Sequence, residues 1–189
     1  MDVWCAIRTY PKHATELGNP IPDEPVFFLK PSSSVVEFGE IDACGGDVHH
    51  EIELVLKLGE GLNPTHMALG LDLTKRSIQD MLKEKRLPWA EAKAFTGAAV
   101  LGEWVEFDER ANFQLEVNRK TMQIGSLMNM SFSINELISK LADWAPIRSG
   151  DILFTGTPSG VGPLNAGDEV TALLYVDSEV VSTHSATCV

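Results

Sequence analysis

Two stretches of alternating side chains constrain the fold of this 189-residue chain more than any other feature. In residues 52–56 large apolar side chains occupy every second position, Glu53 lies between them, and Glu51 directly precedes the run. In residues 67–73 apolar residues again alternate with smaller ones, and Asp72 ends the small-residue row. A period of two is typical of β-strands, because successive side chains point to opposite faces of a sheet. We therefore expect a sheet with one apolar face and one face that carries small and acidic residues.

The rest of the pattern indicates one β-rich domain of mixed α+β class, covering residues 1–189. The hydrophobic content of 44% and the charged content of 22% are typical of a globular protein, and no polar linker divides the chain. Residues 9–25 predict a loop with one helical turn near His13. Helices are expected at residues 74–85 and 133–144, the second with Ser133 and Glu136 as a capping box. Further strands are expected at residues 3–7, 26–29, 151–154, 169–176 and 180–184, with a hairpin turning at 118–119 within 114–124.

Charge and composition exclude several classes of function. The net charge of −12 argues against a nucleic-acid partner, because phosphate binding requires clustered lysine and arginine. No apolar run is long enough to cross a bilayer, and residues 1–4 lack the basic, apolar start of a secretory signal. The three cysteines are scattered, so we expect neither a disulfide framework nor a cysteine metal site. These features predict a cytoplasmic protein without membrane contact.

Three carboxylates are candidates for a metal site. Glu51 and Glu53 lie two residues apart, so on a strand they project from one face, and their repulsion favours a cation between them. Asp72 is the natural third ligand, because it is the lone acid of an otherwise apolar strand. Three hard oxygen ligands without a cysteine favour Mg²⁺ or Mn²⁺ over Zn²⁺. A half-exposed strand with unrelated acids shows the same spacing, so the pattern alone leaves both interpretations open.

Other polar residues could supply acid–base or oxyanion chemistry. His13 and Glu16 lie three residues apart, so one helical turn would place them side by side, and a carboxylate beside a histidine raises its basicity. An exposed loop histidine is the competing interpretation. Lys93 lies in an apolar setting that would partly desolvate its ammonium group, or its stem could simply pack on Phe95. The segment at 156–162, GTPSGVG, lacks the lysine of a P-loop and predicts a tight turn that lines a pocket.

These features belong to a series of short motifs that follow one another along the chain. In order they are residues 8–16 (RTYPKHATE), 25–31 (PVFFLKP), 49–54 (HHEIEL), 71–79 (LDLTKRSIQ), 87–89 (LPW), 93–96 (KAFT) and 155–162 (TGTPSGVG). Together they resemble the fumarylacetoacetate hydrolase family, and most of all its short acylpyruvase and oxaloacetate decarboxylase members. The resemblance extends over nearly the whole chain. It implies a fold like the family's C-terminal domain, a β-roll with a few peripheral helices.

The resemblance also implies a role for each matching residue. Mg²⁺, or Mn²⁺ in its place, would be held by Glu51, Glu53 and Asp72. Water would be activated by the pair His13 and Glu16, and Lys93 would stabilise developing negative charge. The positions that match substrate contacts are Arg8, Lys30, Arg76, Gln79 and Thr157. Thr9 and the segment 97–99 depart from the usual family pattern at the rim of the pocket, so they leave the choice of substrate open.

The implied activity is the Mg²⁺-dependent hydrolysis of a carbon–carbon bond in a short 2,4-dioxo acid, such as an acylpyruvate or fumarylpyruvate. The same site would also decarboxylate oxaloacetate, since both reactions pass through pyruvate enolate. The alternatives are a 2-oxo acid decarboxylase or tautomerase as the main activity, or a non-catalytic metal-binding protein with this fold. The combination of His13, Glu16 and Lys93 speaks against the last of these. The family resemblance further implies a homodimer.

Overall fold

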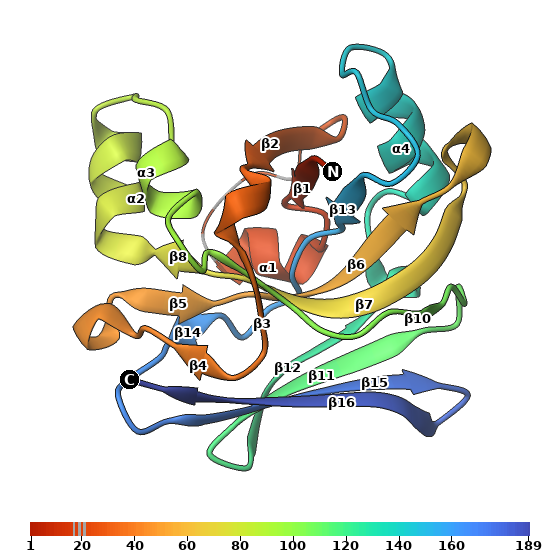
Figure 1. Ribbon diagram of the computed structural model, residues 1–189. Coiled ribbons are helices and arrows are strands. Elements are labelled where there is room, and N and C mark those ends of the chain that lie inside the picture. The colour runs from red at the N-terminus through yellow and green to blue at the C-terminus, as the bar shows by residue number, and fades with distance from the viewer. Residues whose placement is uncertain (17, 19, 21) are drawn as a thin grey trace.

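The structure is a computed structural model, and it describes residues 1–189 except Leu17, Asn19 and Ile21. Within this part of the chain, eight strands form one large curled sheet (Figure 1). In spatial order they are β2 (Val26–Lys30), β1 (Val3–Ile7), β13 (Ile152–Phe154), β6 (Ile52–Leu58), β7 (Pro64–Asp72), β9 (Ala99–Leu101) and β3 (Val35–Glu37), with β10 (Val105–Glu106) paired to β7. Parallel pairing joins β1 to β13 and β3 to β9.

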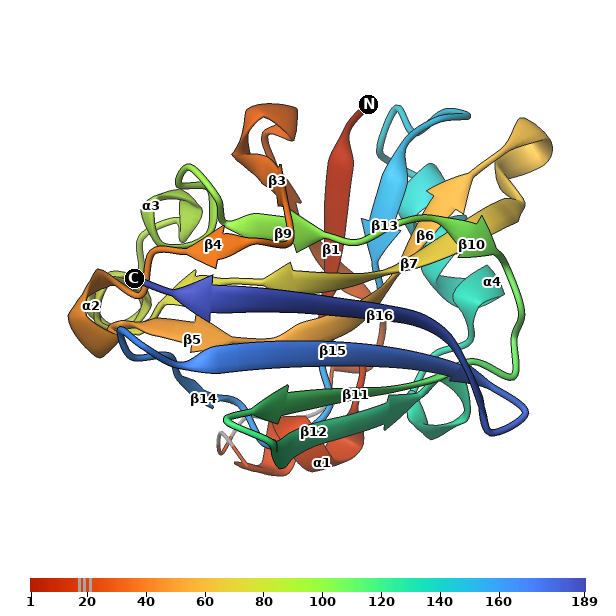
Figure 2. The same cartoon turned by 60° about the horizontal axis from the view of Figure 1, so that its bottom comes forward.

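A second, five-stranded sheet packs against the large one and lies in front of it in Figure 2. Its order is β12 (Lys120–Ser126), β11 (Asn112–Val117), β15 (Glu169–Val176), β16 (Glu179–Cys188) and β4 (Glu40–Ile41). A small third sheet links the segments around the site in the order β14 (Gly162–Pro163), β5 (Val48–His50) and β8 (Thr74–Lys75).

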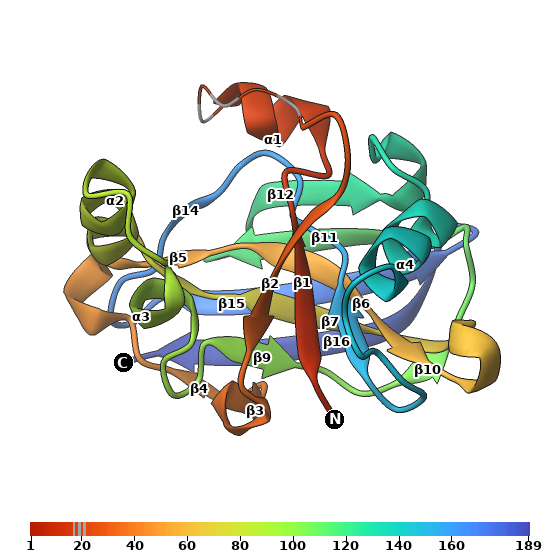
Figure 3. The ribbon, with the colours of Figure 1, turned by 90° about the horizontal axis from the view of Figure 1, so that it is seen from above.

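The helices lie at the margins of the large sheet. In the view from above, α2 and α3 lie together on one side, α4 lies on the other, and α1 lies apart from both (Figure 3). Their bounds are α1 (Pro11–Glu16), α2 (Arg76–Glu84), α3 (Ala90–Lys93) and α4 (Ile134–Ala142). Single 3₁₀ turns occur at η1 (Ser32–Ser34), η2 (Cys44–Gly46), η3 (Glu60–Leu62) and η4 (Leu127–Asn129). Among the described residues, no helix has the length and apolar character needed to span a membrane.

The two faces of the large sheet bury different kinds of side chain. Leu54 and Leu56 of β6 point into the main core, where they join Phe113 and other residues of the second sheet. Val55, on the opposite face, belongs to a smaller core with Cys5 and other apolar residues of β1 and β13. Because side chains alternate along a strand, the acids of β6 and β7 share the face of this smaller core. The alternation in the sequence therefore decides which face of the sheet carries the site.

The predicted β-rich α+β class is confirmed, and so are the two alternating strands. The predicted hairpin is also confirmed, since β11 and β12 are joined at Asn118 and Arg119, whose φ angles of 53° and 65° are typical of a type I′ turn. Helix α4 begins with the predicted capping box of Ser133 and Glu136.

Several predicted boundaries were wrong, two of them by enough to change how an element pairs or where it ends. The helix expected from residue 74 begins at Arg76, because Thr74 and Lys75 form β8 and pair with β5. The last strand runs from Glu179 to Cys188 rather than from 180 to 184, since it pairs with β15 over most of its length. The helical turn expected near His13 is α1. Three positions of the loop predicted at 9–25 (Leu17, Asn19 and Ile21) lie outside the described residues.

Candidate active site

The three candidate ligands meet at one point of the large sheet. Glu51 directly precedes β6, Glu53 lies within it, and Asp72 ends the neighbouring strand β7. Strand pairing places Glu53 opposite Gly70, and the Asp72 backbone N–H donates to the carbonyl of Glu51 at 2.9 Å. One carboxylate oxygen from each acid lies within 4.8 Å of the others, and all three residues are buried. The spacing in the sequence thus corresponds to a real cluster.

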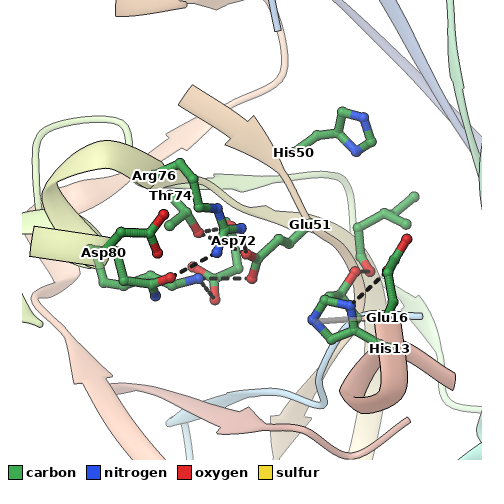
Figure 4. Close-up of polar contacts among 12 residues, drawn as sticks. His13, Glu16, His50, Glu51, Asp72, Thr74, Arg76 and Asp80 are labelled. Carbon is green, nitrogen blue, oxygen red and sulfur yellow. Dashed lines mark hydrogen bonds and ion pairs between the residues drawn. The ribbon is translucent and has the colours of Figure 1, made fainter. Parts of the chain in front are cut away.

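Two of the three carboxylates are neutralised by neighbouring cations. The Lys93 ammonium donates to Glu51 Oε2 at 2.8 Å and to Asp72 Oδ2 at 2.7 Å. Arg76 Nη2 donates to Glu51 Oε1 at 2.7 Å, as the dashed lines of Figure 4 show. Burial raises the pKa of Glu51, but Lys93 and Arg76 outweigh it and bring this pKa to about 2. Burial lowers the pKa of Lys93, yet its two carboxylate partners raise it above the ordinary lysine value.

Glu53 differs from the other two acids. Its recorded partner is the backbone N–H of Gly156, which donates to Oε2 at 2.7 Å, and no lysine or arginine of the described residues forms an ion pair with it. Burial and the adjacent Asp72 raise the pKa of Glu53 well above its usual range. A buried carboxylate of this kind is costly to ionise unless a cation approaches it. The donor set of three buried carboxylates, one of them without a cation, therefore fits a hard divalent ion.

Lys30 lies behind the site rather than in it. Its side chain is fully buried, and its ammonium lies 2.8 Å from Asp72 Oδ1. It also donates to the carbonyl oxygens of Ala98, at 2.9 Å, and of Lys93. The sequence predicted that Lys30 contacts substrate, but in the structure it does not line the cavity at the carboxylates. Its contacts instead hold Asp72 and the backbone that carries Lys93.

The predicted dyad is present on α1. His13 Nδ1 lies 3.3 Å from Glu16 Oε2, and His13 is buried at the edge of the cavity (Figure 4). The backbone N–H of Gly160 donates to both carboxylate oxygens of Glu16, at 3.1 and 3.2 Å. A carboxylate held in this way fixes the histidine ring and its tautomer. The arrangement is therefore suited to a general base.

The cavity enclosed by these groups is small, with a volume of about 50 Å³. Of the predicted substrate contacts, it is lined by Arg8, Arg76, Gln79 and Thr157. Gln79 Oε1 accepts from Arg76 Nη1 at 2.7 Å, so the two side chains form one polar wall. Thr157 Oγ1 donates to the carbonyl of Ile52 at 2.8 Å, which fixes the hydroxyl beside the acids.

Several residues of the site were not predicted from the sequence. Lys83 lines the cavity and donates to Gln79 Oε1 at 2.9 Å; its spacing of four from Gln79 on α2 was the signal that could have found it. Trp89 also lines the cavity. Gln123 donates to Thr157 Oγ1 at 2.8 Å and accepts from the backbone N–H of Ile52 at 3.1 Å. It comes from β12, and no local pattern in the sequence relates that strand to the acids.

The loop from Thr155 to Gly162 joins the two halves of the site. Its Gly156 holds Glu53 and its Gly160 holds Glu16, as described above. Both glycines have left-handed φ angles, of 100° and 101°. A Cβ atom on Gly160 would lie 2.0 Å from the Met122 carbonyl oxygen, so only glycine fits without a shift of the backbone. The predicted pocket-lining turn is thus the element that positions an acid on each side of the cavity.

Known proteins resemble this chain over almost its full length. Residues 2–181 match the family model described as fumarylacetoacetate (FAA) hydrolase C-terminal. The oxaloacetate tautomerase YcgM of Escherichia coli (strain K12) is 35% identical over 89% of this chain and 86% of its own. A mitochondrial oxaloacetate decarboxylase of Dictyostelium discoideum is 35% identical over 86% of this chain and 84% of its own.

Solved structures agree with the fold. A protein of Oleispira antarctica described as a fumarylacetoacetate isomerase/hydrolase superposes with a TM-score of 0.94 at 38% identity, covering 100% of this chain and 93% of its own. The fumarylpyruvate hydrolase of Pseudomonas aeruginosa, in complex with Mn²⁺ and pyruvate, superposes with a TM-score of 0.89 at 30% identity, covering 100% and 89%.

Proposed function

The chain belongs to the fumarylacetoacetate hydrolase family, and on that premise we propose that it is a divalent-metal-dependent enzyme whose main substrate is oxaloacetate. Its main reaction would be the keto–enol tautomerisation or the decarboxylation of that acid. The observation that carries the proposal is the cluster of Glu51, Glu53 and Asp72 with Lys93 in a cavity of about 50 Å³. A polar cavity of this size admits only a small ligand group, which suits the head of a small 2-oxo acid.

The metal proposed here is Mg²⁺ or Mn²⁺, held by the three carboxylates. When bound, such an ion would supply Lewis-acid polarisation of the carboxylate and 2-oxo oxygens of the substrate. The all-oxygen donor set and the uncompensated Glu53 support this assignment. The structural relative from Pseudomonas aeruginosa was solved with Mn²⁺, which makes manganese a suitable probe for this protein.

The protein's own residues would orient the substrate, stabilise its developing charge and transfer a proton. Arg76 and Gln79 would orient the substrate carboxylate from one wall, because their donors line the cavity. Lys93 would stabilise the negative charge that develops on the 2-oxo oxygen as an enolate forms. His13, oriented by Glu16, would take up or return the proton exchanged at the adjacent carbon during tautomerisation.

Acylpyruvate hydrolysis, the main activity predicted from the sequence, is the second candidate. In that reaction His13 would remove a proton from water, which then attacks the distal carbonyl and yields a carboxylic acid and pyruvate. The dyad and the similarity to a fumarylpyruvate hydrolase favour it. The two named relatives at 35% identity are an oxaloacetate tautomerase and an oxaloacetate decarboxylase, and this is why oxaloacetate is placed first.

A direct assay tests the proposal. The purified protein with Mg²⁺ or Mn²⁺ is given enol-oxaloacetate, acetylpyruvate and fumarylpyruvate, and the ultraviolet decay of the enol and the release of pyruvate are followed separately. We expect oxaloacetate to be turned over with the highest kcat/KM, and EDTA to abolish the activity. Full activity in EDTA would contradict the metal assignment, and a higher kcat/KM for either dioxo acid would reverse the order of the two candidates.

A further inference from the structure

A second cavity adjoins the one at the carboxylates. Its volume is about 390 Å³, against about 50 Å³ for the first. It lies between the edge strand β2 and the segment 88–90 that leads into α3. Ile7, Trp89 and Lys93 line both cavities, so the two spaces meet along one boundary.

The lining of this second cavity is apolar. Apart from Lys93, its described walls consist of apolar residues, among them Val26, Phe28 and Leu29 of β2. The Lys93 ammonium lies 5.4 Å from the centre of the Phe28 ring, but it is already bound to the carboxylates of Glu51 and Asp72. No arginine or histidine of the described chain lines this space. Among the described residues, the lining therefore offers an anion no cation that is not already paired with carboxylates.

Two large apolar residues of the β2 side of this lining are left open to water. Val26 is 42% exposed and Leu29 is 49% exposed, although both lie on a strand of the large sheet. Covering such apolar surface is favourable in proportion to the area removed from water. A hydrocarbon chain would gain this energy here, whereas a carboxylate would lose its hydration without gaining a partner.

We propose that this apolar cavity is a subsite for the distal carbon chain of 2-oxo acids whose carboxylate and 2-oxo groups occupy the first cavity. The inference rests on the proposed function, which places that head group at the metal-binding acids. It adds a class of ligand: 2-oxo acids that end in an alkyl or aryl group, as opposed to those that end in a second carboxylate. Trp89 lies at the boundary, where the chain of such a ligand would pass.

Binding measurements test the subsite without requiring turnover. Calorimetric titrations in the presence of Mn²⁺ would compare the linear 2-oxo acids from pyruvate to 2-oxooctanoate. We expect the affinity to rise about two- to fourfold for each added methylene group until the cavity is filled, the worth of a largely buried CH₂. A 2-oxo acid that is as long as a member of this series but ends in a second carboxylate should bind no more tightly than pyruvate. An affinity independent of chain length would overturn the subsite.

A pair of variants locates the effect. Val26→Asp places a carboxylate in the second cavity, and we expect it to abolish most of the gain with chain length. Leu87→Asp is the matched control, because Leu87 is 49% exposed, close to the 42% of Val26, and is near the cavity wall in sequence but lines neither cavity. The Leu87→Asp variant should keep the full increase in affinity with chain length. If Val26→Asp does not fold, Ala90→Trp, which fills the same space from the other wall, replaces it.

The outcomes separate this inference from the proposed function. If pyruvate binds and oxaloacetate is turned over, but Val26→Asp and Ala90→Trp keep the wild-type gain with chain length, the subsite is wrong and the proposed function stands. If no 2-oxo acid binds in the presence of the metal, the proposed function is wrong, and the proposed subsite is then wrong as well.

Discussion

At the scale of single residues, the three acids of the site differ in how many cations they contact. Asp72 is paired with Lys30 and Lys93, and Glu51 with Lys93 and Arg76, whereas the described residues offer Glu53 a backbone N–H and no ion pair. Glu53 is therefore the acid whose ionisation is most costly and the one that would gain most from a divalent ion.

Because Glu53 has no cation partner among the described residues, its replacement should have opposite effects on protein stability and on metal binding. Glu53→Gln removes the buried charge but keeps a carbonyl oxygen for the Gly156 N–H. We expect the melting temperature of the metal-free protein to stay level or rise by about 2–4 °C, corresponding to about 1 kcal/mol in a chain of this size. Affinity for Mn²⁺ should fall by at least about a hundredfold. Calorimetry with EDTA and titration with Mn²⁺ measure the two effects.

The exposed Glu103 supplies the control for that experiment, since Glu103→Gln should alter neither quantity. Retention of wild-type Mn²⁺ affinity in Glu53→Gln would show that the ion is held elsewhere.

A second residue-level prediction separates the two candidate reactions. Hydrolysis needs a base to create the nucleophile, whereas loss of CO₂ from oxaloacetate takes no proton from water. His13→Ala should therefore lower acylpyruvate hydrolysis by about 10²- to 10⁴-fold and decarboxylation distinctly less. Lys93→Ala should damage both reactions, because both develop enolate charge beside its ammonium. Comparison of kcat for the two substrates in the same variants is the measurement. Equal losses in His13→Ala would mean that the dyad is not simply a water-activating base.

Local sequence spacing predicted some of these residues and missed others for a physical reason. Glu51 and Glu53 share a strand face, and His13 and Glu16 share a helical turn, so their proximity follows from backbone periodicity. Gln123 comes from β12 and contacts the site only through the packing of two sheets. No period relates residues that meet in this way.

At the scale of elements, the loop Thr155–Gly162 couples the acid cluster to the dyad. The helix α1 has only six residues, which is too short to be stable alone, so it needs tertiary contacts, and the Gly160 N–H bound to Glu16 is one of them. The geometry of the base is therefore set by a turn far from it in sequence.

This coupling predicts the effect of a single methyl group. Gly160→Ala would force a Cβ against the Met122 carbonyl oxygen at a left-handed φ, so the loop must shift and release Glu16. We expect kcat/KM to fall at least about tenfold, with a smaller effect on Mn²⁺ affinity. Gly167→Ala is the matched control, because Gly167 also has a left-handed φ, of 90°, but nothing lies within 4 Å of its Cβ position. Equal losses of activity in both variants would contradict the coupling.

The elements differ in how far the sequence predicts them. The long alternating strands β6 and β7, and α4 with its capping box, carry their own signal in period and end residues. The short strands β3 and β9 were not predicted, because three residues are too few to show a period. Their strand conformation depends on pairing with each other across more than sixty residues of sequence.

At the scale of the whole molecule, the main core draws side chains from both ends of the chain, from Trp4 to Cys188. This supports the proposal that residues 1–189 form one domain, and it predicts a single cooperative unfolding transition for the metal-free protein. Calorimetric and spectroscopic melting curves should coincide. Two separated transitions would indicate that the two sheets unfold independently.

The predicted homodimer remains a proposal, and the exposed apolar residues support it. Met128 is 87% exposed, Ile124 66% and Trp144 59%, and a dimer interface would cover such apolar side chains. Sedimentation velocity at micromolar concentration should give twice the 20.7 kDa of one chain. A species of 20.7 kDa under those conditions would contradict the proposal.

The parallel pairing of β1 with β13 has a consequence for synthesis on the ribosome. Strand β1 emerges first, but its parallel neighbour is formed by Ile152–Phe154, and the loop that holds Glu16 follows later still. A nascent chain shorter than about 160 residues therefore lacks both the centre of the sheet and the contacts of the acids. Such long-range closure is slow relative to local helix formation. Until residues 152–154 have been made, the exposed edge of β1 would be open to capture by chaperones or by other nascent chains.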